Sequence, residues 1–226
     1  MELKKISEHI WYMPYEPERD RPNLGYVKGD NWSLAIDAGH SDVHVKEFYA
    51  LLKKENLPLP TITVLTHWHW DHTFGMHAVN GLCIANEKTN AHLMEWKNKI
   101  EANGPAEFLA IDESIRIEYA NDKKVIVKPA DILFSGELTL GLGGCKVQVM
   151  ESEAPHTEDS TLVYVVEDKV LFLGDSTCKD FQKGTKDPVL CQKLADKIKS
   201  LKSETCVEGH WVPVETSDTL SDLLDS

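Results

Sequence analysis

The sequence of 226 residues has no long apolar run and no excess of positive charge. No segment approaches the roughly 20 apolar residues that a membrane-spanning helix needs, and residues 1–9 lack the apolar stretch of a signal peptide. The 24 Lys and Arg residues face 37 Asp and Glu residues, for a net charge of -13. Binding of nucleic acid through phosphate neutralisation needs a basic face, so this balance argues against it. We therefore expect a cytoplasmic protein, or one whose leader has been removed, with no nucleic-acid and no membrane partner.

Cysteine is also scarce, with five residues and no Cys-x-x-Cys spacing. The odd number and the irregular spacing favour reduced thiols in a reducing compartment. Cys178 stands out because it follows Asp175 by three residues. A small buried side chain is nevertheless the favoured interpretation of Cys178.

The length fits one large domain, and the contents of 42% apolar and 27% charged residues are those of an ordinary globular protein. Periodicity and turn residues predict a mixture of strands and helices. Strands are expected at residues 10–13, 25–28, 32–37, 61–66, 132–134, 138–140, 146–150, 161–166, 170–173 and 205–208. Helices are expected at 43–54, 71–79, 91–100, 107–117 and 189–201, with a loop at 14–23 and a turn at 141–144. These patterns alone indicate one domain of mixed α and β structure.

Histidine and aspartate are concentrated in a way that chance does not explain. Four of them lie within six residues, in a chain with only 10 histidines: His67, His69, Asp71 and His72. Imidazole and carboxylate groups are the ligands that borderline divalent metals take from proteins. The short run at 61–66 predicts a buried strand directly before this motif. The motif would then lie at the carboxyl end of a strand, where loops can converge on a site.

The surrounding motifs resemble those of the metallo-β-lactamase superfamily. In chain order they are Thr66 to His72, His156-Thr157-Glu158-Asp159-Ser160, Leu173-Gly174-Asp175-Ser176 and Gly209-His210. The resemblance extends from about residue 6 to about residue 213. It implies an α+β fold, a four-layer αββα sandwich of two mixed β-sheets with outer helices. Residues 1–226 would form a single domain with a helical insertion at about 89–121.

The resemblance also implies a ligand set for two divalent metal ions per chain. It assigns His67, His69 and His156 to a first metal, and Asp71, His72 and His210 to a second metal, with Asp175 bridging the two. Zinc is the expected metal, with iron or manganese as alternatives. Asp71 would in addition act in catalysis, by orienting the nucleophile and accepting its proton.

The implied activity is that of a dinuclear metal-dependent hydrolase that uses a metal-bridging hydroxide. Its small-molecule substrate could be an ester, thioester, lactone, amide or phosphodiester. Two alternatives remain open: an iron-dependent oxidoreductase similar to the persulfide dioxygenases, and a metal-binding protein without catalysis. The commonest zinc β-lactamases carry Cys where this chain has Asp175. Only 16 residues follow His210, too few for the glutathione-binding domain of the related thioesterases.

The sequence does not identify the substrate-binding residues or the oligomeric state. The loop at 14–23 offers Tyr15, Arg19 and Arg21, and the insertion offers His92, Trp96 and Phe108. Such side chains suit a substrate with an apolar body and an anionic end. Trp68 and Trp70 are expected to wall the site, and Asp159 to orient a ligand or a loop by a hydrogen bond. Lys179 is a candidate for substrate contact, although a solvated lysine is the favoured interpretation.

Overall fold

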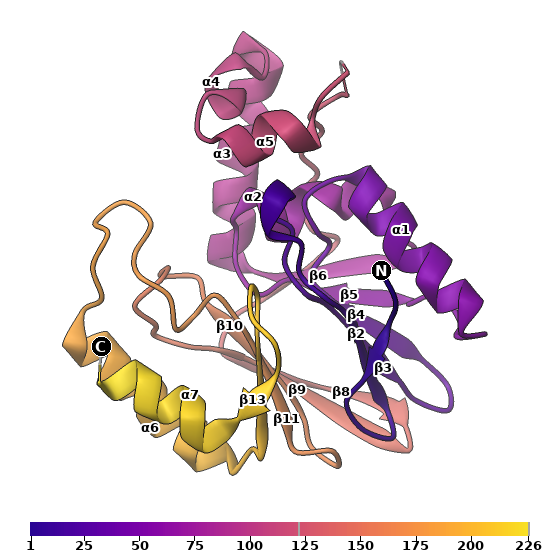
Figure 1. Cartoon of the computed structure of the whole chain (residues 1–226), viewed down its shortest axis with the longest axis vertical. Helices are drawn as coiled ribbons and strands as arrows, with labels where there is room; N and C mark the ends of the chain where they lie inside the picture. Colours follow the sequence, from indigo (N-terminus) through magenta and orange to yellow (C-terminus); the bar gives the residue numbers. More distant parts are fainter. Residues whose placement is uncertain (122, 226) are drawn as a thin grey trace.

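A computed structural model describes residues 1–121 and 123–225 of the chain. Its first β-sheet has seven strands that lie in sequence order (Figure 1). They are β1 (Lys4–Lys5), β2 (Ile10–Met13), β3 (Leu24–Lys28), β4 (Ser33–Ile36), β5 (Ile62–Val64), β6 (Leu82–Asn86) and β7 (Ile132–Phe134). Strands β1 to β4 pair antiparallel, whereas β4 to β7 pair parallel, so the sheet is mixed.

The second sheet has six strands in the order β13-β12-β11-β10-β9-β8. They are β8 (Glu137–Gly143), β9 (Cys145–Glu151), β10 (Thr161–Val165), β11 (Val170–Gly174), β12 (Thr205–Glu208) and β13 (Val214–Glu215). β11 and β12 are parallel, and the other neighbours are antiparallel. The carboxyl ends of β11 and β12 therefore lie at the same edge, which is where two of the expected metal ligands follow.

Alternation along the strands of the second sheet divides their side chains between two cores. Val163 and Val165 of β10 face the first sheet, in a core that also contains Ile36 and Val64. Leu162 points to the opposite side, where the sheet packs against helices. This period of two is what a strand buried on both faces requires.

Helices cover the outer face of each sheet (Figure 1). α1 (Asp42–Lys54) packs on the first sheet through buried Phe48 and Leu52. α6 (Pro188–Leu201) and α7 (Thr216–Leu224) cover the second sheet. The resulting layers are helix, sheet, sheet and helix, which confirms the α+β sandwich expected from the sequence. No helix of the described residues is both long and apolar enough to cross a membrane.

The segment expected to be a helical insertion forms α3 (Glu87–Asn103), α4 (Ala106–Leu109) and α5 (Glu113–Glu118), which project beyond the sheets in Figure 1. Buried side chains from all three helices join one apolar cluster with residues of the metal motif and of the segment directly after it: Leu93, Phe108, Ile115, Trp70 and Phe74. The insertion is therefore part of the hydrophobic core. The single helix expected at 107–117 is wrong, because two short helices occupy that segment.

Several other local predictions were wrong or incomplete. The helix expected at 71–79 is divided into α2 (Trp70–Thr73) and the 3₁₀ helix η2 (Phe74–Ala78). Thr73 has a non-helical φ of -128°, and its hydroxyl donates to the His69 carbonyl, so the first helix ends there. Residues 141–143 continue β8, and the tight connection is made at Gly143 and Gly144. Four elements were not predicted from the sequence: β1, β6, β13 and α7. The 3₁₀ helix η1 (Pro17–Arg19) in the loop at 14–23 was not predicted either.

Candidate metal centre

Strand ends bring the candidate ligands to one edge of the sandwich. The motif at 67–72 follows β5, Asp175 follows β11, and His210 follows β12 by two residues. Two glycines permit the close approach of these segments. A Cβ atom at Gly174, whose φ is +52°, would lie 2.4 Å from Thr66 Oγ1, and one at Gly209 would lie 2.1 Å from Asp175 Oδ1. Glycine is thus required at both positions, because a larger residue would collide with Thr66 or Asp175.

His67, His69 and His156 form the first cluster. One ring nitrogen of each residue lies within 4.8 Å of the others, and all three side chains are buried. His156 Nε2 lies 3.0 Å from His69 Nδ1. The structure therefore brings together the three residues that were expected to hold the first metal.

Asp71, His72, Asp175 and His210 form the second cluster. Asp71 Oδ2 lies 3.1 Å from His210 Nε2 and 3.2 Å from His72 Nε2. The Asp175 carboxylate lies 3.5 Å from His72 Nε2 and 3.4 Å from His210 Nε2. Its Oδ2 atom is also 3.9 Å from Nε2 of His156, in the first cluster. Asp175 therefore lies between the two clusters, as a bridging carboxylate would.

The two clusters differ in their electrostatics. Burial, reinforced by neighbouring imidazoles, holds the pKa of His67 well below its usual range and lowers that of His69 to about 3. Burial would also lower the pKa of His210, but the Asp175 and Asp71 carboxylates outweigh it and raise that pKa to about 10. His67 and His69 of the first cluster are thus held as neutral imidazoles, whereas the second cluster pairs imidazoles with carboxylates. Divalent metal ions accept both donor types.

Unpartnered polar atoms test whether metal ions fit here. His67 Nε2, His72 Nε2 and Asp175 Oδ1 are buried and have no hydrogen-bond partner among the described residues. Buried polar groups are nearly always satisfied, so three orphaned donor atoms in one place require an explanation. Metal coordination explains them, since imidazole nitrogen and carboxylate oxygen are the atoms left free.

Residues behind the ligands fix the orientation of two imidazole rings. Asp37 lies 2.7 Å from His72 Nδ1 and accepts hydrogen bonds from both the backbone N–H and the hydroxyl of Thr66. The Lys179 carbonyl oxygen lies 2.7 Å from His156 Nδ1. Each contact leaves Nε2 as the atom that faces the clusters, an arrangement typical of metal-bound histidine.

The sequence analysis missed Asp37, which it treated as a strand end, and no local motif indicated its role. For Lys179 it considered only the side chain, whereas the carbonyl group makes the contact. Asp159 was expected to orient either a ligand or a loop, and its side chain contacts α3 from the loop that carries it. Its Oδ2 accepts a hydrogen bond of 2.7 Å from Thr89 Oγ1 on α3, so it holds a loop and the insertion together.

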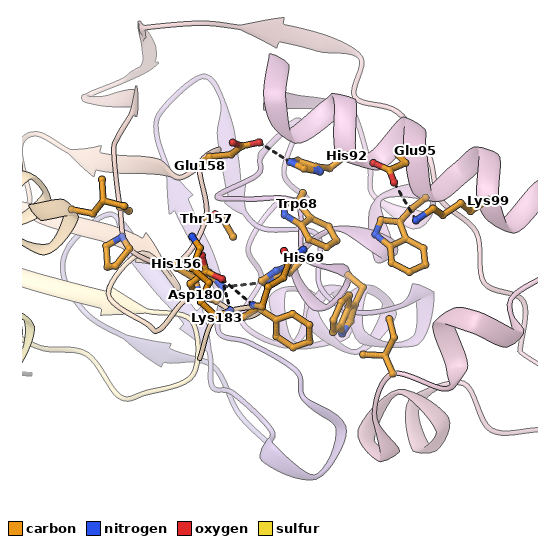
Figure 2. A pocket seen from close by; sticks show the side chains of 18 residues that line it. Trp68, His69, His92, Glu95, Lys99, His156, Thr157, Glu158, Asp180 and Lys183 are labelled. Carbon is orange, nitrogen blue, oxygen red and sulfur yellow. Dashed lines mark hydrogen bonds and ion pairs between the residues drawn. The ribbon is translucent and has the colours of Figure 1, made fainter. Parts of the chain in front are cut away.

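A pocket of about 570 Å³ opens beside His69 and His156 (Figure 2). Trp68, His92 and Trp96, three of the residues proposed to wall the site or contact substrate, line it. Phe181, which the sequence analysis did not select, also lines it. A second pocket of about 690 Å³ shares His156 and Phe181 with the first and is also lined by Trp211 and Val212.

Two of the side chains offered for substrate contact are unavailable for it. Arg21 is completely buried and its guanidinium contacts Glu118, Glu16 and Glu47. Phe108 is also completely buried, in the core cluster of the insertion. Both predictions were wrong because the sequence does not show which arginine and aromatic side chains are buried in the folded protein.

Comparisons with known proteins agree with this geometry. Residues 18–210 match the family model described as the metallo-beta-lactamase superfamily. A metallo-beta-lactamase from Pontibacter korlensis is similar in structure, with a TM-score of 0.68 and 24% identity, over 99% of this chain and 97% of that one. The DIM-1 metallo-beta-lactamase exposed to ceftazidime gives 0.68 and 19%, over 99% and 94% of the two chains. A double mutant of the sec-alkyl sulfatase PisA1 gives 0.69 and 13%, over 99% of this chain and 40% of that one.

Proposed function

The chain belongs to the metallo-beta-lactamase superfamily, and from that premise we propose that it is a dinuclear metal-dependent hydrolase of a small-molecule substrate. The observation that carries the proposal is the pair of adjacent ligand clusters with Asp175 between them. We assign His67, His69 and His156 to one metal ion and Asp71, His72 and His210 to the other, with Asp175 shared. Zinc is the proposed metal.

Two divalent ions held in this way would lower the pKa of a water molecule towards neutrality and polarise a carbonyl, phosphoryl or sulfuryl oxygen. The protein's own contribution is to hold the ligands rigidly and to place an acceptor for a proton. Asp71 is suited to that second role. Burial would raise its pKa, but His72 and the hydrogen bond with His210 hold it well below the usual range. Its carboxylate is therefore ionised and can orient a water molecule by accepting a hydrogen bond from it. We propose, from its place beside the second cluster, that it also takes that molecule's proton.

The first experiment is elemental analysis of protein purified without a chelator. We expect close to two metal ions per chain, with zinc predominant. A stable value of one that added zinc does not change would contradict the dinuclear assignment. Iron together with substrate-dependent oxygen consumption would favour the oxidoreductase alternative.

The second experiment is a panel of substrates assayed with metal-loaded protein. It contains esters, thioesters, lactones, amides and phosphodiesters, together with a β-lactam and a secondary alkyl sulfate because the similar structures bear those names. Turnover should disappear on chelation and return when zinc is added. Absence of turnover on every bond type by protein with two bound metal ions would favour a metal-binding protein without catalysis.

A further inference from the structure

We propose that the pocket beside His69 and His156 binds an uncharged aromatic part of the substrate, between Trp96 and Phe181. The inference rests on the proposed function, in which the bond that is cleaved lies at the metal centre. The 570 Å³ pocket would then bind the part of the substrate that does not react. A pocket of this volume is of ordinary size for a small ligand. Three observations support the proposal: the arrangement of the aromatic rings, the pairing of the charges and the way that α3 faces the pocket.

Aromatic rings from three separate segments surround the pocket. Trp68 belongs to the metal motif, Trp96 to α3, and Phe181 to the segment between β11 and α6. The Phe181 ring is 56% exposed, and its centroid lies 5.5 Å from that of His69 and 5.4 Å from that of Trp70. Covering this exposed ring with a flat aromatic group would remove apolar surface from water and so contribute favourable free energy to binding.

The charged side chains of the pocket are already paired with one another. Lys99 lies 3.1 Å from Glu95 and also over the Trp96 ring. Lys183 lies 2.8 Å from Asp180. Figure 2 shows both pairs, with the Lys99 and Glu95 pair on the insertion helix.

A third acidic residue, Glu158, lies 3.3 Å from His92 on the same pocket. Three carboxylates against two lysines leave one net negative charge on the pocket side chains, with the histidines taken as neutral. Away from the metal centre, an anionic group would therefore meet no unpaired lysine among the described residues that line the pocket. This replaces the expectation of an anionic end, which depended in part on the buried Arg21.

The spacing on α3 shows that one stripe of the helix faces the pocket. His92, Glu95, Trp96 and Lys99 all line it, at positions i, i+3, i+4 and i+7. That spacing is one face of an α-helix. Leu93, between them in sequence, is completely buried in the core. The insertion thus supplies both part of the core and one wall of the pocket.

Binding of carboxamide probes to the metal-loaded protein, each first shown by mass spectrometry to stay intact during the titration, tests the inference without requiring turnover. The probes are 2-naphthamide, its saturated analogue decahydronaphthalene-2-carboxamide, and 6-carbamoylnaphthalene-2-sulfonate, measured by isothermal titration calorimetry. We expect 2-naphthamide to bind more tightly than both other compounds. Trp96→Ala and Phe181→Ala should each raise its Kd by roughly three- to tenfold, the range that one aromatic contact supports. Phe181 is 56% exposed, so its variant can still be tested if Trp96→Ala does not fold. Because Phe181 lines both pockets, its result is interpreted together with that of Trp211→Ala, which changes the second pocket alone.

Two matched tryptophan variants serve as controls. Trp32 is 52% exposed on the turn between β3 and β4, and Trp211 is 51% exposed and lines the second pocket. Neither Trp32→Ala nor Trp211→Ala should change the Kd. Equal binding of the sulfonate or of the saturated probe would overturn the inference, and so would a loss of binding in Trp211→Ala alone. Absence of turnover on the substrate panel would instead count against the proposed function and leave this binding result intact.

Discussion

Replacing Asp37 by asparagine should weaken metal binding at the second cluster by about 10- to 100-fold, the usual effect of losing a group that orients a metal-bound histidine. Asp37 is 3% exposed and accepts three hydrogen bonds, two from Thr66 and one from His72 Nδ1. Its φ of +65° is a conformation that asparagine also adopts, so the substitution itself adds little backbone strain. The effect should therefore come from the hydrogen bonds.

An asparagine side chain has one acceptor and one donor, whereas this position needs acceptors on both sides. If its oxygen faces the Thr66 backbone N–H, its amide nitrogen faces His72 Nδ1. His72 must then become an acceptor at Nδ1 and carry its proton on Nε2, the atom that faces the cluster. If the amide is reversed, its nitrogen faces the Thr66 backbone N–H, which cannot accept. The first orientation therefore removes His72 Nε2 as a metal ligand, and the second removes the buried hydrogen bond with Thr66.

The assay is competition for zinc between the protein and a chelator of known affinity, at a fixed pH. Asp168→Asn is the matched control, because Asp168 makes an equally short contact of 2.7 Å with His9 far from the clusters. We expect the control to bind zinc like the parent protein. Unchanged zinc affinity in folded Asp37→Asn protein would refute the reasoning, as would an equal loss in both variants.

Three further outcomes are expected. Asp175→Ala should lower both metal content and turnover, the latter by orders of magnitude, because two cations lose the anion between them; unaltered turnover on an identified substrate would remove Asp175 from the site. Glu118→Ala should lower the free energy of unfolding in urea by about 3 kcal/mol, the low end for a broken buried ion pair, because Glu16 and Glu47 still contact Arg21. A loss below about 1 kcal/mol would contradict this expectation. Burial raises the pKa of Cys83 to about 12, so iodoacetamide at pH 8 should modify it only after unfolding, as mass spectrometry would show.

The elements that the sequence predicted correctly are those whose pattern is local. Strands such as β10 and β11 are apolar runs rich in β-branched, aromatic and leucine residues, and α1 has both an amphipathic pattern and a Ser41 cap. β6 was missed because Leu82 to Asn86 has no alternation and contains only one β-branched residue. The family resemblance, and not periodicity, supplied the two-sheet architecture.

The candidate ligands could be identified because they form motifs, and the groups that support them could not. Asp37 is 35 residues from His72 in sequence, and the Lys179 carbonyl is a backbone atom that any residue would offer. The fate of Arg21 was equally hidden, since its partner Glu118 is 97 residues away. That contact depends on the packing of α5 against the loop at 14–23, which no local pattern shows.

A single charge on α3 should control which probes the pocket accepts. Glu95→Gln removes the ion-pair partner of Lys99 and brings the net charge of the pocket side chains from one negative to zero. The sulfonate-bearing naphthamide should then bind about two- to fivefold more tightly, an effect that salt should reduce because the pair is exposed. Glu101→Gln is the matched control, because Glu101 pairs with Lys97 on the same helix outside the pocket. No tightening in Glu95→Gln, or equal tightening in both variants, would show that the pocket charges do not act on the ligand.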